Sequence, residues 1–136
     1  MKKNIKVKQH DDADCGAACL ASISSFYKLR IPLSKIRQYA STDRMGTNIM
    51  GLVDAANKLN FDAKGVKGNI DILKKVPKPF IAHIVTEAQL QHYVVVYETK
   101  KSFIKLMDPA TGKIYKYSYD DFGKRWSNNL FFLLYK

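Results

Sequence analysis

The sequence predicts an α+β protein in which a helical N-terminal half packs on an antiparallel β-sheet built by the C-terminal half. Apolar residues recur at helical spacing between residues 14 and 60. From residue 79 onward they gather in short runs that are rich in β-branched and aromatic residues. Because a chain of 136 residues can bury one core, we expect a single domain over residues 1–136.

Three helices are predicted in the first half. Asp14 is placed to cap the first helix, and Pro32 stands near the start of the second, PLSKIRQYA. Thr47 is the expected cap of the third, TNIMGLVDAANKLN, and Asn60 its left-handed stop. The residues expected to face inward are Cys19, Leu20, Ile23, Phe26 and Tyr27 in the first helix and Ile49, Leu52, Val53 and Ala56 in the third.

Five strands are predicted in the second half, separated by short polar breaks. They are PFIAHIV, HYVVVYET, SFIKLMD, KIYKYSY and LFFLLY, which end at residues 85, 99, 108, 119 and 135. The chain stops directly after the last apolar strand. We therefore expect it to be a domain of a longer protein.

The composition is that of a soluble globular protein, with 46% hydrophobic and 26% charged residues. The N-terminus lacks the apolar run of a secretory signal, so we expect a cytosolic domain with two free thiols. A net charge of +11 fits a nucleic acid, an anionic membrane face or an acidic peptide as partner. The basic residues are scattered and no nucleic-acid-binding motif is present, which argues against a nucleic-acid partner.

Cys15 is the first candidate catalytic residue. It follows Asp14 at the expected helix start, where free N–H groups and the helix dipole favour a thiolate. The alternative is a small buried residue, the commoner fate of a cysteine. Cys19, one turn deeper and beside Leu20, is expected in the core. A zinc site through both cysteines and two histidines is a further reading, although their spacing matches no common structural pattern.

A thiolate needs a base, and the candidates are His10, His83 and His92. We expect His10 to be solvated and His83 to be a satisfied core histidine, whereas His92 opens a strand at the sheet rim. If that strand pairs with SFIKLMD across a turn at residues 100–101, His92 lies opposite Asp108 or Pro109. Asp108 could then orient the imidazole, although an Asp-Pro pair is also an ordinary turn opener.

Gln9 is the last candidate. Acyl transfer needs a donor aimed at the developing oxyanion, and a side-chain amide near the nucleophile can supply it. Taken alone, a surface glutamine is common and carries little information. Its position six residues before Cys15 is what makes Gln9 a candidate oxyanion-hole residue.

The motifs together resemble the peptidase C39 family. Gln9 is followed by Asp14-Cys15-Gly16 and Ala18-Cys19-Leu20, and then by MGTNIMGLVDAANKLNF, PFIAHIV, HYVVVYE and MDPATG in the family's order. Asn60 stands where the family would have glycine, but it tolerates the same left-handed backbone. The resemblance implies a papain-like cysteine peptidase fold. It also implies Cys15 as nucleophile, His92 as general base and acid, Asp108 as orienting residue and Gln9 as oxyanion donor.

The same resemblance implies a function. Such domains form the N-terminal, cytosolic part of bacteriocin-processing ABC transporters and cleave leader peptides after a double-glycine-type motif. The implied partners are a precursor peptide and the transporter's membrane and nucleotide-binding domains. ATP would be used only by that nucleotide-binding domain, and the peptidase domain would need no cofactor or metal. The peptidase domain would lie at the cytoplasmic face of the membrane. A catalytically silent domain that only recruits a secretion substrate is the alternative.

Overall fold

The computed structural model describes residues 6, 14–40 and 49–135, and for Ile49 only the backbone. It contains five helices and six strands within these ranges. The helices are α1 (Cys15–Phe26), α2 (Leu33–Tyr39), α3 (Ile49–Lys58), α4 (Ile70–Lys75) and α5 (Tyr119–Arg125). The strands are β1 (Asp62–Lys67), β2 (Phe80–Val85), β3 (Gln91–Thr99), β4 (Phe103–Asp108), β5 (Lys113–Ser118) and β6 (Trp126–Tyr135).

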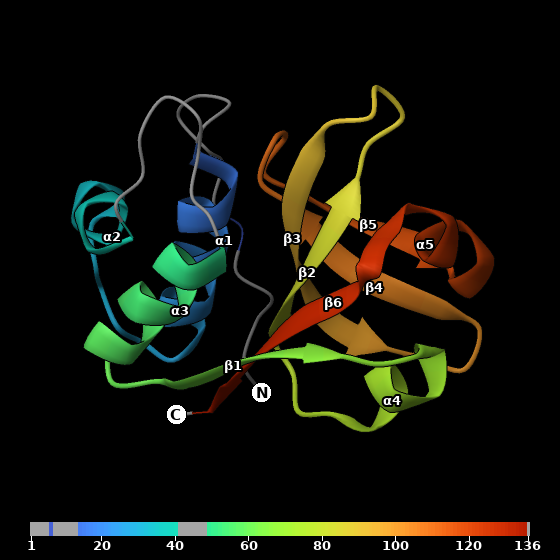
Figure 1. Ribbon diagram of the computed structural model, residues 1–136, viewed down its shortest axis with the longest axis horizontal. Coiled ribbons are helices and arrows are strands. Elements are labelled where there is room, and N and C mark those ends of the chain that lie inside the picture. The colour runs from blue at the N-terminus through green and yellow to red at the C-terminus, as the bar shows by residue number, and fades with distance from the viewer. Residues whose placement is uncertain (1–5, 7–13, 41–48, 136) are drawn as a thin grey trace.

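The six strands form one sheet in the order β1-β6-β2-β3-β4-β5, and every neighbouring pair is antiparallel. Figure 1 shows α1, α2 and α3 together on one side of the sheet, with α4 and α5 on the other side. The predicted α+β class, with a helical half packed on an antiparallel sheet, is therefore confirmed. None of the helices among the described residues is long and apolar enough to cross a bilayer.

The three predicted helices and five predicted strands are all present, with ends that differ by a few residues. Pro32 occupies the N-cap position of α2, and Asn60 has the predicted left-handed backbone, with φ of 69°. Leu52 and Ala56 are buried, as expected for the inner face of α3. Thr47, the expected cap of α3, lies outside the described residues.

Three elements were not predicted: β1, α4 and α5. Strand β1 has the sequence DAKGVK, in which only Ala63 is buried, so it lacks a strand's usual apolar signal. It is held as an edge strand by pairing with the strongly apolar β6. The short helices do carry a sequence signal, because Asn69 and Ser118 cap them by accepting hydrogen bonds from the N–H groups of Ile72 and Asp121.

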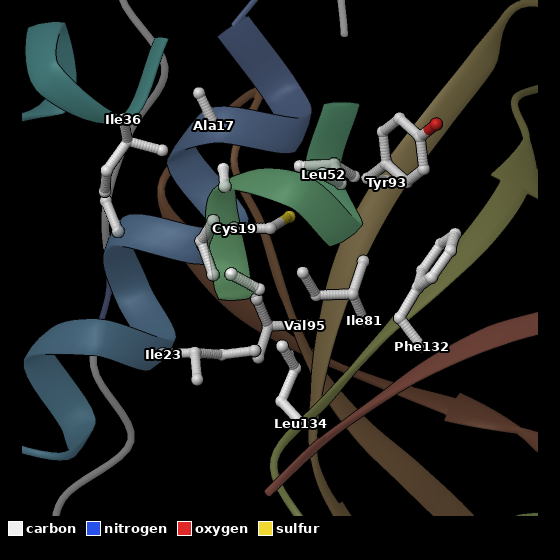
Figure 2. Close-up of a cluster of buried hydrophobic side chains, with 14 of the residues drawn as sticks. Ala17, Cys19, Ile23, Ile36, Leu52, Ile81, Tyr93, Val95, Phe132 and Leu134 are labelled. Carbon is white, nitrogen blue, oxygen red and sulfur yellow. The ribbon is translucent and has the colours of Figure 1, made fainter. Parts of the chain in front are cut away.

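The sheet separates two hydrophobic clusters. The first joins the sheet to helices α1–α3 and includes Cys19, Ile23, Leu52, Tyr93 and Phe132, as Figure 2 shows. The second lies on the side of α4 and α5 and is built from the alternate residues of β2, β3 and β4. This alternation follows from the two-residue period of a strand. The start of β3 and the end of β4, where polar residues stand, lie together at the rim of the sheet beside the start of α1.

Gly16 is needed where α1 meets the rest of the first cluster. A Cβ atom there would lie 3.2 Å from both Leu52 Cδ atoms and 3.3 Å from Tyr93 Cδ2. We predict that Gly16→Ala lowers the free energy of unfolding by about 1–3 kcal/mol through overpacking. The matched control is Gly123→Ala in α5, where nothing lies within 4 Å of the new atom. Urea unfolding should show that this control gains up to about 1 kcal/mol from helix propensity. Equal stability of the two variants would contradict the packing argument.

Candidate active site

Cys15 is the first residue of α1 and is half-buried. Helix α1 packs on β3, so its N-terminal end lies beside the rim of the sheet. The first N–H groups of a helix have no partner within the helix, and the helix dipole is positive at this end. The Cys15 side chain therefore lies at the positive end of the helix, beside N–H groups that have no partner within it.

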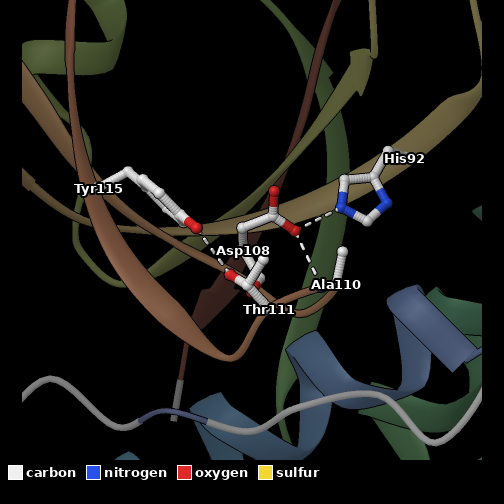
Figure 3. A network of polar contacts seen from close by, with 5 residues as sticks. All are labelled: His92, Asp108, Ala110, Thr111 and Tyr115. Carbon is white, nitrogen blue, oxygen red and sulfur yellow. Dashed lines mark hydrogen bonds and ion pairs between the residues drawn. The ribbon is translucent and has the colours of Figure 1, made fainter. Parts of the chain in front are cut away.

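His92 and Asp108 meet at the same rim. His92 is the second residue of β3 and Asp108 the last residue of β4, and His92 Nε2 lies 2.7 Å from Asp108 Oδ1. The N–H of Ala110 donates to the same carboxylate oxygen at 2.9 Å, as Figure 3 shows. In the turn that follows, the N–H of Gly112 donates to the carbonyl of Asp108 at 2.8 Å. The carboxylate is thus held by its own turn as well as by the histidine.

The predicted closeness of His92 and Asp108 is correct, but the predicted register is wrong by one or two residues. Val95 pairs with Met107, and a β-bulge interrupts the ladder between Val96 and Glu98. Asp108 is therefore a diagonal neighbour of His92 and not its direct partner. Diagonal side chains still come within reach when they are long enough, which is the case here. The bulge lies inside the strand, where no glycine or proline announces it.

The two ring nitrogens of His92 have different partners. Because Nε2 binds Asp108, Nδ1 is the nitrogen that is left for its side-chain hydrogen bond with Cys15. Burial alone would lower the pKa of His92. The hydrogen bonds that the ring donates to Asp108 and Cys15, together with their negative charges, outweigh burial and raise this pKa to about 9. At neutral pH the ring is therefore an imidazolium between two acceptors.

Asp108 is affected in the opposite sense. Its burial raises the pKa of the carboxyl group, but the hydrogen bonds from His92 and from the Ala110 N–H lower it more, so the net shift is downward. The carboxylate is thus ionised throughout the neutral range. An ionised acceptor on Nε2 keeps the ring in one orientation with Nδ1 turned to Cys15.

Cys19 lies in the core, as predicted. It is fully buried in the first cluster, and burial, followed by the charges of Cys15 and Asp108, raises its pKa well above that of a free thiol. A neutral buried thiol is a poor nucleophile. Within the described residues no group of three or more histidine, cysteine, aspartate or glutamate side chains is arranged to hold a metal ion.

His83 is half-buried in β2 and belongs to neither hydrophobic cluster, so the expectation of a satisfied core histidine is not met. Its ring stacks on Tyr93 with the centroids 4.8 Å apart, and burial and the charge of His92 lower its pKa. Nδ1 of His83 is buried without a hydrogen-bond partner among the described residues. Gln9 and His10 lie outside the described residues, so the oxyanion-hole role of Gln9 stays a prediction.

The sequence did not reveal Arg37. Asp14 does occupy the N-cap position of α1, but its side chain accepts no capping hydrogen bond, contrary to the prediction. Its Oδ1 atom lies instead 2.7 Å from Nε of Arg37 on α2. No local sequence pattern joins these two residues, since the contact depends on how α2 packs on α1.

Comparison with known proteins gives the family to which this chain belongs. The model of the peptidase C39 family matches residues 3–135. The lactococcin-G-processing and transport ATP-binding protein LagD of Lactococcus lactis subsp. lactis is 42% identical over 134 residues, which cover 97% of this chain and 19% of that protein. The mesentericin-Y105 transport/processing ATP-binding protein MesD of Leuconostoc mesenteroides is 38% identical over 136 residues, with the same shares. The chain thus spans about a fifth of the length of these curated relatives.

Solved structures of related peptidase domains have the same fold as this chain. The peptidase domain of Streptococcus ComA, a bi-functional ABC transporter of a quorum sensing pathway, superimposes with a TM-score of 0.90 at 31% identity and covers 98% of both chains. A double glycine motif protease from an AMS/PCAT transporter, solved with its leader peptide, has a TM-score of 0.86 at 27% identity, covering 98% of this chain and 92% of that one. The chain belongs to the peptidase C39 family and has its papain-like fold.

Proposed function

We propose that this chain is a cysteine endopeptidase that removes the leader from bacteriocin-type precursor peptides after a double-glycine-type motif. One observation carries the proposal: Cys15 stands at a helix start and hydrogen-bonds to a histidine that Asp108 holds from the other side. The relatives support the substrate class. Lactococcin G and mesentericin Y105 are named in the processing activities of LagD and MesD, and a double glycine motif protease shares the fold.

In the proposed mechanism Cys15 Sγ adds to the carbonyl carbon of the residue before the cut. The negative oxygen is stabilised by the N–H groups at the start of α1 and by the amide of Gln9. The C–N bond then breaks, and the imidazolium of His92 gives its proton to the leaving amine, which departs with the mature peptide. Water, deprotonated by the neutral ring, hydrolyses the thioester and releases the leader, which restores the starting ion pair.

We also propose the setting of this activity. The domain would act as part of an ABC transporter, at the cytoplasmic face of the membrane, where processing is coupled to export. The names of the relatives, which combine processing, transport and ATP binding, support this arrangement. ATP would bind the transporter's separate nucleotide-binding domain, and the peptidase step needs only Cys15, His92, Asp108 and Gln9, without a cofactor or a nucleic-acid partner.

The test is cleavage of a synthetic precursor peptide that carries a double-glycine leader. We expect one cut, directly after the second glycine, identified by mass spectrometry of both fragments. A matched peptide with valine at that second glycine should lose about tenfold or more in kcat/KM, since a site shaped for glycine has no room for the added carbons. No cleavage by freshly reduced protein, or equal cleavage of both peptides, would contradict the proposal.

A further inference from the structure

A buried carboxylate stands directly before the proposed nucleophile. Asp14 is completely buried, although aspartate is rarely buried without a partner. Its side chain makes no capping hydrogen bond to the first turn of α1. Asp14 Oδ1 and Arg37 Nε lie 2.7 Å apart without forming a hydrogen bond of good geometry, so the attraction between them is chiefly that of opposite charges.

Arg37 is held in place by the packing of α2. It lies in the last turn of that helix, where the dipole favours a cation, and its side chain is 36% exposed. The preceding residue, Ile36, is completely buried in the first cluster. Figure 2 shows Ile36 pointing from α2 toward α1, so this contact sets how the two helices pack. The core thereby determines where the guanidinium lies.

The Arg37 guanidinium matters because of the other charged groups near Cys15. The titratable and charged groups near Cys15 among the described residues are His92 and Tyr93 on β3, Asp108 on β4, Asp14 and Cys19 beside or on α1, and Arg37 on α2. A thiolate at Cys15 would follow the Asp14 carboxylate directly in the chain and face the His92 imidazolium, with the Asp108 carboxylate on the other side of the ring. Without Arg37, the charge of Asp14 would oppose the thiolate at a site partly shielded from water.

The orientation of Asp14 has a second consequence. An aspartate at an N-cap usually accepts from the N–H groups of the first turn and so occupies them. Here the carboxylate is paired with Arg37, and those N–H groups are not taken by its side chain. The Asp14 side chain therefore does not compete for these N–H groups with a negative sulfur at Cys15 or with an oxyanion formed beside it.

We propose that Asp14 and Arg37 are a positioning pair that keeps the start of α1 electrically neutral and uncapped, so that Cys15 can carry its charge. This inference rests on the proposed function only for its effect on cleavage. Neither residue needs to touch the substrate. The pair acts through Cys15, and its removal therefore changes the reactivity of the sulfur before any peptide binds.

The test measures the rate of Cys15 alkylation by iodoacetamide against pH, with each cysteine followed by peptide mass mapping. The fully buried Cys19 should stay unmodified as long as the protein is folded. Arg37→Gln should move the midpoint upward by about one pH unit, which slows alkylation about tenfold below that midpoint. Asp14→Asn, which leaves Arg37 unopposed, should move it downward. The double variant should return toward the wild-type value. The matched control is Arg30→Gln, an exposed arginine just before α2, which should leave the midpoint unchanged.

Opposite shifts in the two single variants separate charge from simple structure, because a loosened helix would move both in the same direction. In cleavage assays Arg37→Gln should lower kcat about tenfold at pH 6–7 with little change in KM. An unchanged midpoint in folded Arg37→Gln overturns the inference. If that variant does not fold, an unchanged midpoint in Asp14→Asn overturns it. If the wild-type protein cleaves no precursor but the variants show these shifts in the alkylation midpoint, the proposed function is refuted and the inference about the Asp14–Arg37 pair stands.

Discussion

Replacing Cys15 with alanine will abolish leader cleavage and leave the protein folded. Without the sulfur no thioester can form, and the remaining hydrogen-bond donors can only polarise a carbonyl for attack by water. We expect kcat to fall by about 10⁴-fold or more. Cys15 is half-buried at the helix end, so the loss of one sulfur atom there removes little packing. The unfolding midpoint should therefore stay close to that of the wild type.

The matched control is Cys19→Ala, which removes a thiol one turn further along the same helix. Cys19 is completely buried in the first cluster, so this variant should lose about 1 kcal/mol of stability through a small cavity. Its cleavage of a double-glycine precursor should remain near that of the wild type. The measurements are fragment release by chromatography and urea unfolding of both variants. Cleavage by Cys15→Ala, or loss of cleavage in a folded Cys19→Ala variant, would contradict the assignment of Cys15 as the nucleophile.

Replacing Asp108 with asparagine will have the second largest effect. An asparagine keeps the shape of the side chain but cannot attract the imidazolium, and its amide can turn a donor toward Nε2. The ring would then hold its charge less strongly and would lose its fixed orientation toward Cys15. For an orienting carboxylate of this kind we expect kcat to fall by about 10²–10⁴-fold.

The pH dependence gives a sharper measure of the same change. His92 has a folded pKa of about 9, above its ordinary value of 6.5, so the imidazolium and its stabilising contacts persist in neutral solution and are lost as pH rises through about 9. The alkaline limb of kcat/KM should lie there. In Asp108→Asn this limb should move downward by about one pH unit or more, because burial lowers the pKa once the carboxylate is gone.

A suitable control is Glu98→Gln. Glu98 is on the same hairpin, but its carboxylate pairs with Lys100 and Lys105 at 3.2 Å each, on the surface and away from His92. This variant should keep the alkaline limb of the wild type. A direct titration of the His92 ring by NMR in all three proteins would follow the shift independently of turnover. An unchanged limb in Asp108→Asn would rule out Asp108 as the source of the raised pKa.

The sequence by itself determined the helices and strands whose patterns are strong and local. Strands β2–β6 are short runs rich in β-branched and aromatic residues between polar breaks, whereas the longer apolar stretch of α1 fits a helix. Asn60 tolerates the left-handed backbone that follows α3. Cys15 could be placed at a helix start, and His92 near Asp108, because a hairpin brings residues of neighbouring strands together even when the register is misjudged.

Only the tertiary structure decided the rest. Strand β1 depends on β6, more than sixty residues away, for its hydrogen bonds, and its own side chains carry almost no strand signal. The charge state of His92 depends on the balance between burial and two hydrogen-bonding partners, which exists only once α1 meets the sheet. Asp14 was assigned as a cap from its neighbours in sequence, yet its carboxylate turns to Arg37. A nearby full charge, placed there by the packing of α2, competes successfully with the weaker pull of the helix's own N–H groups.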